Sequence, residues 1–115
     1  MMSSNKRNIK RLRQRLQIKF GAEGPSRFGF TEDISSTGIF IKSAIVQNPN
    51  TLLQIEISAP AGEIIRLTGR VMWAKKVPPN LLQRVKGGMG IRITAFQDGE
   101  DVYRRICAEL EERYA

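Results

Sequence analysis

Two short segments carry the residue types best suited to bind an anion and a purine base. They are Arg11-Leu-Arg-Gln-Arg15 and Asp33-Ile-Ser-Ser-Thr-Gly38, and 18 positions separate Arg15 from Asp33. An arginine guanidinium offers a planar fork of donors that fits a phosphate or the O6/N7 edge of guanine. Aspartate and serine supply acceptors and a hydroxyl for the N–H groups of the base. Together the two segments predict a guanine-nucleotide site.

The residue types and the spacing of both segments resemble the signature of the PilZ domain, which is RxxxR followed by [DN]xSxxG. Both motifs are complete here, and Arg15–Phe20, Gly69–Trp73 and Gly88–Ile93 are similar to strands of that family. The resemblance covers roughly residues 10 to 112. It implies a bacterial receptor module for cyclic di-GMP, with a mainly β fold: a six-stranded antiparallel β-barrel and a C-terminal α-helix packed on it.

The resemblance also implies a role for each motif residue. In the family the two arginines hold the phosphates and guanines of the ligand, so Arg11 and Arg15 take those roles. Asp33 and Ser35 would contact a base, and Gly38 would let the strand start close to the ligand. The same three residues also suit an ordinary β-turn, in which a glycine can supply a positive φ. Turn and site are compatible interpretations.

Two other side chains are weaker candidates for ligand contact. Arg13 is expected to point away from the face that Arg11 and Arg15 share, which leaves it as a supplementary phosphate contact. Trp73 could stack on a base, but its place in an apolar alternation with Val71 favours core packing.

The apolar residues along most of the chain recur with a period of two, which is typical of half-buried strands. We expect strands between about residues 15 and 96, among them one at Phe28 and Phe30 before the Asp33 turn. The segment Lys75–Gly87 is predicted to be a long connection, because its prolines cannot continue a ladder. A helix over about residues 98–114 is predicted next, with Asp98 as its cap. Its apolar face is expected to carry the residues Val102, Tyr103, Ile106, Cys107, Leu110 and Tyr114.

The length of the chain and the distribution of its charge indicate its domain organisation. We expect a single domain over residues 11–115, because 115 residues supply one core. Residues 1–22 carry seven basic groups and no acidic one, and we interpret residues 1–10 as a basic, flexible arm. The single cysteine forms no intrachain disulfide, and no apolar run reaches the length of a membrane span or a secretory signal. A cytoplasmic location is expected.

The composition argues against catalysis, because the chain has no histidine and one cysteine. The usual general base, the Cys–His pair and the common zinc sets are therefore absent. We predict no enzyme activity, no metal and no cofactor, with cyclic di-GMP as ligand and an unidentified effector protein as partner. Two alternatives remain: an adaptor of the same fold that ignores the nucleotide, and a basic barrel that binds nucleic acid. Nucleic acid ranks lowest, since Phe28, Phe30 and Trp73 occupy apolar positions rather than forming an exposed stacking platform.

Overall fold

Alternating apolar side chains fold this chain into a closed β-barrel, seen here in a computed structural model that describes residues 11–113. The expected arm, residues 1–10, and the expected helix residue Tyr114 lie outside the described residues. Seven antiparallel strands form one sheet: β1 (Leu12–Arg13), β2 (Gln17–Gly21), β3 (Arg27–Ile34), β4 (Gly38–Lys42), β5 (Leu52–Ser58), β6 (Ile64–Lys75) and β7 (Gly88–Asp98).

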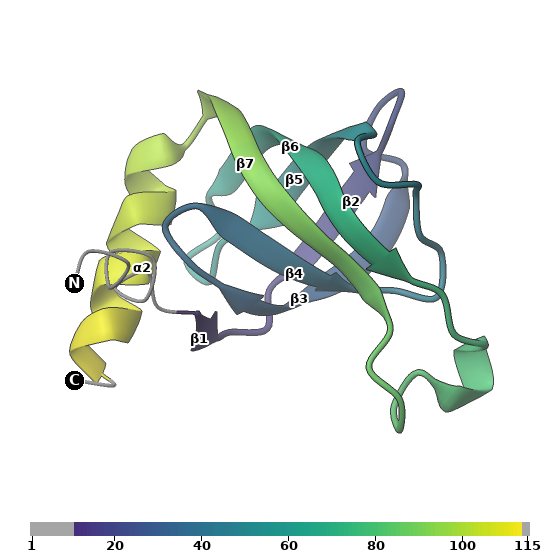
Figure 1. Ribbon diagram of the computed structural model, residues 1–115. Helices are drawn as coiled ribbons and strands as arrows, with labels where there is room; N and C mark the ends of the chain where they lie inside the picture. Colours follow the sequence, from purple (N-terminus) through teal and green to yellow (C-terminus); the bar gives the residue numbers. More distant parts are fainter. Residues whose placement is uncertain (1–10, 114–115) are drawn as a thin grey trace, which may run out of the picture.

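The barrel closes because β3 pairs with both β2 and β4. The strands follow one another in the order β1-β3-β2-β5-β6-β7-β4, and the additional β3–β4 pairing completes the ring. Strand β1 lies outside the ring and pairs with the end of β3 (Figure 1). The predicted six-stranded barrel is confirmed, with β1 as one extra strand that the alternation did not reveal.

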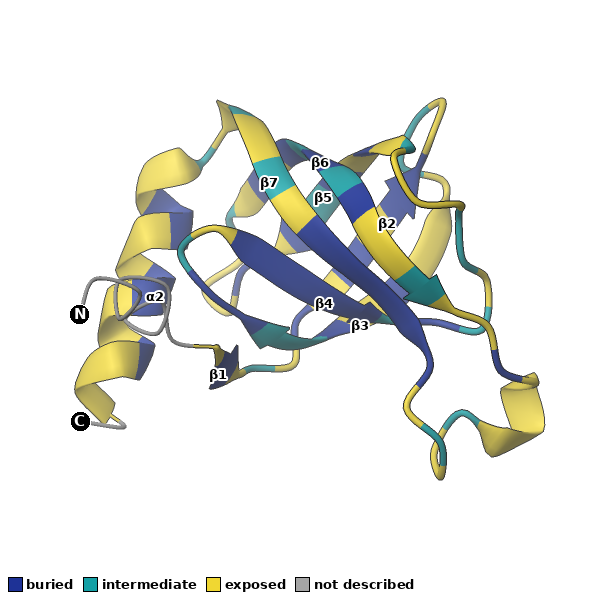
Figure 2. Cartoon of the chain, viewed as in Figure 1, coloured by how far each residue is buried: buried dark blue, intermediate teal, exposed yellow. Residues whose placement is uncertain are grey.

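The inward face of each strand fills a single hydrophobic core (Figure 2). The period-two prediction is confirmed for β2, β5 and most of β6, where inward residues alternate with polar ones. The fully buried large side chains in this core include Phe20, Ile18, Ile55, Ile57, Ile65 and Leu67. Burying each such side chain contributes about 1.5–3 kcal/mol, so this alternation fixes which face of every strand points inward.

Helix α2 (Glu100–Arg113) packs on one end of the barrel, as predicted, through its apolar face (Figure 1). The predicted cap is wrong, because the helix begins two residues later than expected. Asp98 is the last residue of β7, and Gly99 follows it with φ 80° before the helix starts. A left-handed residue at this point suits glycine, which lets the chain leave the strand and enter the helix within one residue.

The predicted long connection is confirmed between β6 and β7. It contains only a short 3₁₀ helix, η1 (Pro79–Leu81), and it projects away from the end of the barrel opposite α2 (Figure 1). The side chain of Leu81 is 38% exposed, whereas Leu82 is half-buried. Leu82 is therefore the residue of this pair that packs toward the body.

Three aromatic residues expected in the core lie at the surface instead. Phe28, Phe30 and Trp73 are 65%, 39% and 43% exposed. A register shift between Val71 and Trp73 interrupts the alternation of β6, which turns the indole outward. The indole stacks on Phe40 with ring centroids 5.3 Å apart. Phe28 and Phe30 point outward because Gly29 and Thr31 take the inward positions of β3.

Trp73 also covers Gly90, the residue that faces it on β7. A Cβ atom at position 90 would lie 2.2 Å from the indole Nε1. We expect Gly90→Ala to displace the indole, to lower the free energy of unfolding by about 1–3 kcal/mol and to shift the emission of the only tryptophan. Urea denaturation followed by fluorescence and circular dichroism measures both effects. In a Trp73→Ala background the same change should cost less, and an equal cost in both backgrounds would contradict this account.

Candidate functional site

The two sequence motifs meet because β1 pairs with the end of β3. Leu12 faces Ile34, and Arg13 faces Asp33. Leu12 is 8% exposed and joins the core, which ties this short strand to the barrel. The segment from Arg11 to Arg15 is extended at Leu12 and Arg13, so its arginines do not share a helix face.

A buried threonine holds the rest of this segment in place. The Thr31 hydroxyl accepts a hydrogen bond from the Leu16 backbone N–H at 2.8 Å and donates one to the Gln14 carbonyl. The Gln14 N–H donates to the Glu32 carbonyl at 3.1 Å. Because Thr31 is 2% exposed, its hydroxyl must be satisfied inside the protein, and residues 11–16, named the arm segment, satisfy it.

Each arginine of the segment has a different partner on β3. Arg11 Nη1 lies 2.8 Å from Asp33 Oδ1, and Arg13 Nη2 lies 3.8 Å from Glu32 Oε2. The Arg15 guanidinium carbon lies 3.9 Å from the centre of the Phe30 ring, a cation–π contact. The three cations are exposed while Leu12 and Leu16 are buried, so they lie on the outer side of the segment. The expectation that Arg13 points away from a face shared by Arg11 and Arg15 is wrong, because Arg13 and Arg15 line one cleft and Arg11 does not.

The segment Ser35–Gly38 forms the tight turn between β3 and β4. The Ser35 N–H donates to the Gly38 carbonyl at 2.9 Å, and the Ser35 Oγ accepts from the Gly38 N–H at 3.0 Å and the Thr37 N–H at 3.3 Å. Ser35 is 3% exposed. In this conformation its hydroxyl caps the turn, which is the ordinary structural role of the motif serine. Its contact with a base stays a prediction.

Gly38 is needed for close packing and not for a positive φ. Among the glycines of residues 11–113, the positive φ values belong to Gly24, Gly62, Gly88 and Gly99, and not to Gly38. A Cβ at position 38 would lie 2.7 Å from the Ile91 carbonyl oxygen, so glycine is required because β4 approaches β7 closely, and not because the turn needs a positive φ. The nearest side-chain atom to that Cβ is Arg11 Nη2 at 3.9 Å.

Helix α2 reaches this turn through two side chains. The Tyr103 hydroxyl donates to the Ser35 carbonyl at 2.6 Å and lies 3.3 Å from the Gly38 carbonyl. Arg104 Nη1 donates to the Ser36 carbonyl at 2.9 Å. Burial raises the pKa of Tyr103 well above its usual range, so the phenol stays neutral and keeps its proton for these carbonyls.

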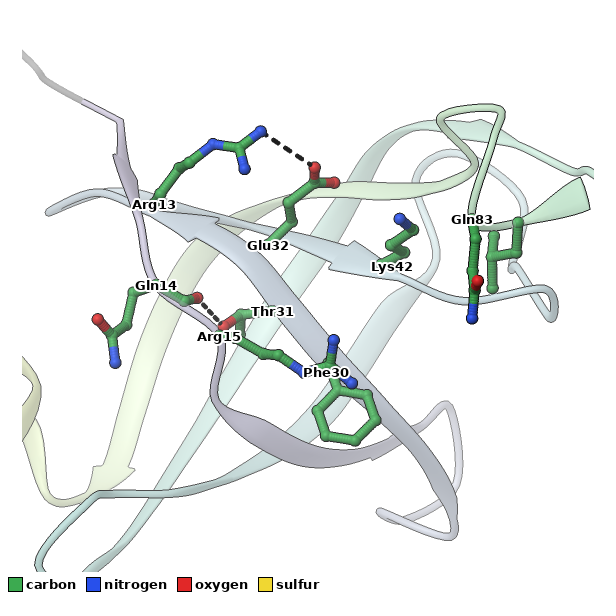
Figure 3. A pocket seen from close by; sticks show the side chains of 9 residues that line it. Arg13, Gln14, Arg15, Phe30, Thr31, Glu32, Lys42 and Gln83 are labelled. Atoms are coloured by element: carbon green, nitrogen blue, oxygen red, sulfur yellow. Dashed lines mark hydrogen bonds and ion pairs between the residues drawn. The ribbon is translucent and has the colours of Figure 1, made fainter.

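A cleft of about 560 Å³ lies beside the motifs, between the arm segment and the β6–β7 connection. Figure 3 shows Arg13 reaching toward Glu32, with Arg15 beside the Phe30 ring and Gln83 on the opposite wall. The lining residues are Arg13, Gln14, Arg15, Phe30, Thr31, Glu32, Lys42, Leu82 and Gln83. Three cations and one carboxylate in a cleft of this size suit a phosphorylated small molecule.

The sequence prediction missed most of this lining. Phe30, Glu32 and Lys42 fall outside both motifs, and Gln83 comes from a distant loop. Of these lining residues, only Thr31 could have been singled out from the sequence, because it is a polar residue at an inward position of an apolar alternation. Arg11, Asp33, Ser35 and Gly38 gather beside the cleft without lining it.

Comparison with known proteins agrees with this geometry. The family model described as "PilZ domain" matches residues 5–109. The chain belongs to the PilZ domain family. The known role of this family is to bind cyclic di-GMP, and its members are receptor and adaptor modules that interact with effector proteins and are not typically enzymes.

The PilZ fold is shared with a solved structure titled "Structure of Bacillus subtilis Inhibitor of motility (MotI/DgrA)". The TM-score is 0.71 at 16% identity, and the match covers 95% of this chain. It covers 51% of the other protein, so this chain spans about half of that protein's length. No curated protein matches the chain. Within residues 11–113, no helix is long and apolar enough to cross a membrane.

Removing the Tyr103 hydroxyl tests its role in holding the turn. Tyr103→Phe keeps the ring and its packing against Phe96, whose centroid lies 5.4 Å away. We expect the free energy of unfolding to fall by about 1–2 kcal/mol, because two buried carbonyls lose a donor. Urea denaturation at neutral pH measures this loss. Equal stability of the two proteins would mean that the hydroxyl contributes nothing to the turn.

The same residue predicts an alkaline sensitivity. The unfolded phenol has its ordinary pKa of 10.0, whereas the folded pKa is raised by burial. The folded state therefore binds this proton more tightly, so its stabilisation is present below about pH 10 and is lost as the pH rises further. Burial also raises the pKa of the Cys107 thiol, and a hydrogen bond with Tyr103 lowers it, so the two proteins are compared in a Cys107→Ala background. We expect the stability of Tyr103→Phe to decline less steeply above pH 10 than that of the wild type.

Proposed function

We propose that this protein is a cyclic di-GMP receptor that passes the signal to a protein partner. The ligand docks beside the Ser35–Gly38 turn, Arg11 and Arg15 bind its phosphates and guanines, and Asp33 and Ser35 contact a base. The observation that carries the proposal is the ion pair that joins the two motifs: Arg11 and Asp33 are 22 positions apart in the sequence, and their side chains lie 2.8 Å apart. If the side chains of the two motifs lay far apart, the protein could not bind one ligand with both, whatever its family.

The ion pairs at the site are weak enough to be exchanged for a ligand. The Arg11 side chain is 51% exposed and that of Arg13 is 80% exposed. Exposed pairs of this kind contribute about 0–1 kcal/mol, because water screens both charges. A bidentate phosphate contact replaces such a pair favourably and leaves the carboxylates free to accept from guanine N–H groups.

This exchange supports a change of conformation on binding. Each arginine that turns from β3 toward a phosphate changes the surface that the arm segment presents, while buried Leu12 and the hydrogen bonds of Thr31 keep its backbone on the barrel. The Ser35–Gly38 turn lies next to the arm segment. The turn contacts helix α2 through the side chains of Tyr103 and Arg104. The partner protein would bind a surface made by the arm segment, the turn and the helix, since a ligand shifts the population of the state it binds better.

One observation favours nucleic acid as a second candidate. The exposed rings of Phe28 and Phe30 each carry a cation, with Lys19 Nζ 5.5 Å from the first ring centre and Arg15 3.9 Å from the second. Cations beside exposed aromatic rings are typical of single-strand platforms. The two candidates separate by measurement, because oligonucleotide binding would fall steeply with salt and would not require a cyclic dinucleotide.

Calorimetric titration with cyclic di-GMP tests the proposal, with GTP, cyclic AMP and a single-stranded oligonucleotide as comparisons. We expect low-micromolar or tighter binding confined to cyclic di-GMP. Arg11→Ala and Arg15→Ala should each lose about 1.5–3 kcal/mol of binding free energy, because each removes charge-assisted contacts. No heat with cyclic di-GMP at high micromolar concentration would refute the receptor and leave the nucleotide-independent adaptor.

Arg27→Ala is the matched control for both arginine variants. Arg27 is exposed at the opposite end of β3, so it removes one positive charge without touching the motifs. We expect its affinity for cyclic di-GMP to match that of the wild type. An equal loss in all three variants would indicate a general charge effect rather than a site.

A further inference from the structure

Glu32 occupies the extra position of a β-bulge. Thr31 faces Ile41 and Asp33 faces Phe40, so the register of β3 against β4 shifts by one residue between them, at Glu32. A regular strand would place alternate side chains on opposite faces. The bulge instead leaves both Glu32 and Asp33 partly exposed, as two adjacent carboxylates. Bulges often re-aim a side chain beside a functional site.

The two carboxylates have unequal partners. Asp33 accepts a hydrogen bond from Arg11 at 2.8 Å. Glu32 accepts none within residues 11–113: its Oε2 lies 3.8 Å from Arg13, and its Oε1 is buried with no hydrogen-bond partner. A buried acceptor without a donor is unfavourable, and more so when it is charged. Glu32 therefore gains from any ligand that brings N–H donors into the cleft that it lines.

The chemistry around Glu32 selects the ligand class. An ionised carboxylate only accepts hydrogen bonds. Guanine presents two adjacent donors, N1–H and the N2 amino group, whereas adenine presents an acceptor at N1. Phe30 supplies a flat ring, and Arg13, Arg15 and Lys42 supply positive charge for a phosphate in the same cleft. A guanine nucleotide satisfies all of these groups, and an adenine nucleotide leaves the carboxylate facing a lone pair.

We infer that Glu32 is a second guanine-recognition residue, which reads a base in the cleft between the arm segment and the β6–β7 connection. The inference rests on the proposed function, because a cyclic dinucleotide supplies a second guanine beyond the one assigned to Asp33. Arg11 with Asp33 and Arg13 with Glu32 form two arginine–carboxylate pairs between the arm segment and β3. Each pair offers a cation for phosphate and an acceptor for guanine.

Glu32→Gln tests this inference with cyclic di-GMP, the mixed cyclic GMP–AMP and cyclic di-AMP as ligands. We expect the variant to bind cyclic di-GMP about 10- to 100-fold more weakly, because the amide offers one acceptor in place of a charged pair. The affinity for the mixed dinucleotide should change much less. The ratio of the affinity for cyclic di-GMP to that for cyclic GMP–AMP is therefore expected to be smaller in the variant than in the wild type. Removing a negative charge from a basic cleft would by itself strengthen the binding of a dianion, so a loss isolates recognition from general electrostatics.

Glu63→Gln is the matched control. Glu63 also has a buried Oε1 without a partner and also pairs with an arginine, Arg105 at 2.9 Å, but it does not line the cleft. We expect its ligand preferences to equal those of the wild type. Thermal denaturation of both variants confirms that each is folded before titration.

The outcomes separate the inference from the proposed function. Wild-type binding of cyclic di-GMP, with affinity and preference unchanged in Glu32→Gln, overturns the inference and leaves the receptor standing. Tighter binding by Glu32→Gln also overturns it and assigns Glu32 a repulsive role. Wild-type protein that binds none of the three dinucleotides refutes the proposed function, and the role of Glu32 falls with it.

Discussion

The pairing of β1 with β3 is the constraint on which the arrangement of the site depends. It is a ladder of only two residue pairs, Leu12 with Ile34 and Arg13 with Asp33. Such a short ladder is not stable by itself, since an isolated pair of strands is marginal even at greater length. Burial of Leu12 in the core and the hydrogen bonds of buried Thr31 supply what the ladder lacks. The arginines are thus placed by an apolar anchor and a neutral hydroxyl, and their own charges are left for other partners.

Because Leu12 and Thr31 position the arm segment, the ion pairs at the site can be weak. If the Arg11–Asp33 contact held the arm segment in place, exchanging it for a ligand would release the segment. Because Leu12 and Thr31 hold the segment, the arginines can change partners while the backbone stays paired. The bulge in β3 adds a second carboxylate beside the first. An otherwise strongly basic segment therefore faces two acceptors, which reduces the repulsion among its cations and gives a guanine something to bind.

Much of the barrel could be predicted from the sequence, because a period of two assigns each strand residue to one face wherever pairing is regular. Phe20, Ile55 and Ile57 are buried as their positions require. The same logic failed at Trp73, where a bulge interrupts the period. A bulge arises from the register between two strands, so the pattern of one strand does not reveal it. Strand β1 was missed because two residues are too few to show a period.

The site was predictable only in part, for a related reason. The motif resemblance singled out Arg11 and Asp33 although periodicity gives no cause for them to meet, and the structure brings them together. Glu32 and the cleft wall at Gln83 depend on a bulge and on a loop that folds back from another part of the chain. The residues next to Glu32 and Gln83 in the sequence predict neither the bulge nor the position of the loop.

Tyr103 gives the site a mechanical connection that the motifs alone do not. Its hydroxyl contacts carbonyls at both ends of the Ser35–Gly38 turn, and its ring lies in the core of the helix–barrel interface. Any ligand that displaces the turn must therefore leave a buried phenol without an acceptor or move the helix with it. Leaving the phenol unpaired costs about 1–3 kcal/mol. A small rotation of an end-packed helix can avoid that cost, so the turn and α2 are expected to move as one unit. The energy available for such a movement is limited to the difference in ligand affinity between the two states. A signal that leaves this domain through α2 must therefore be driven by contacts made at the turn, not by the overall affinity of the cleft.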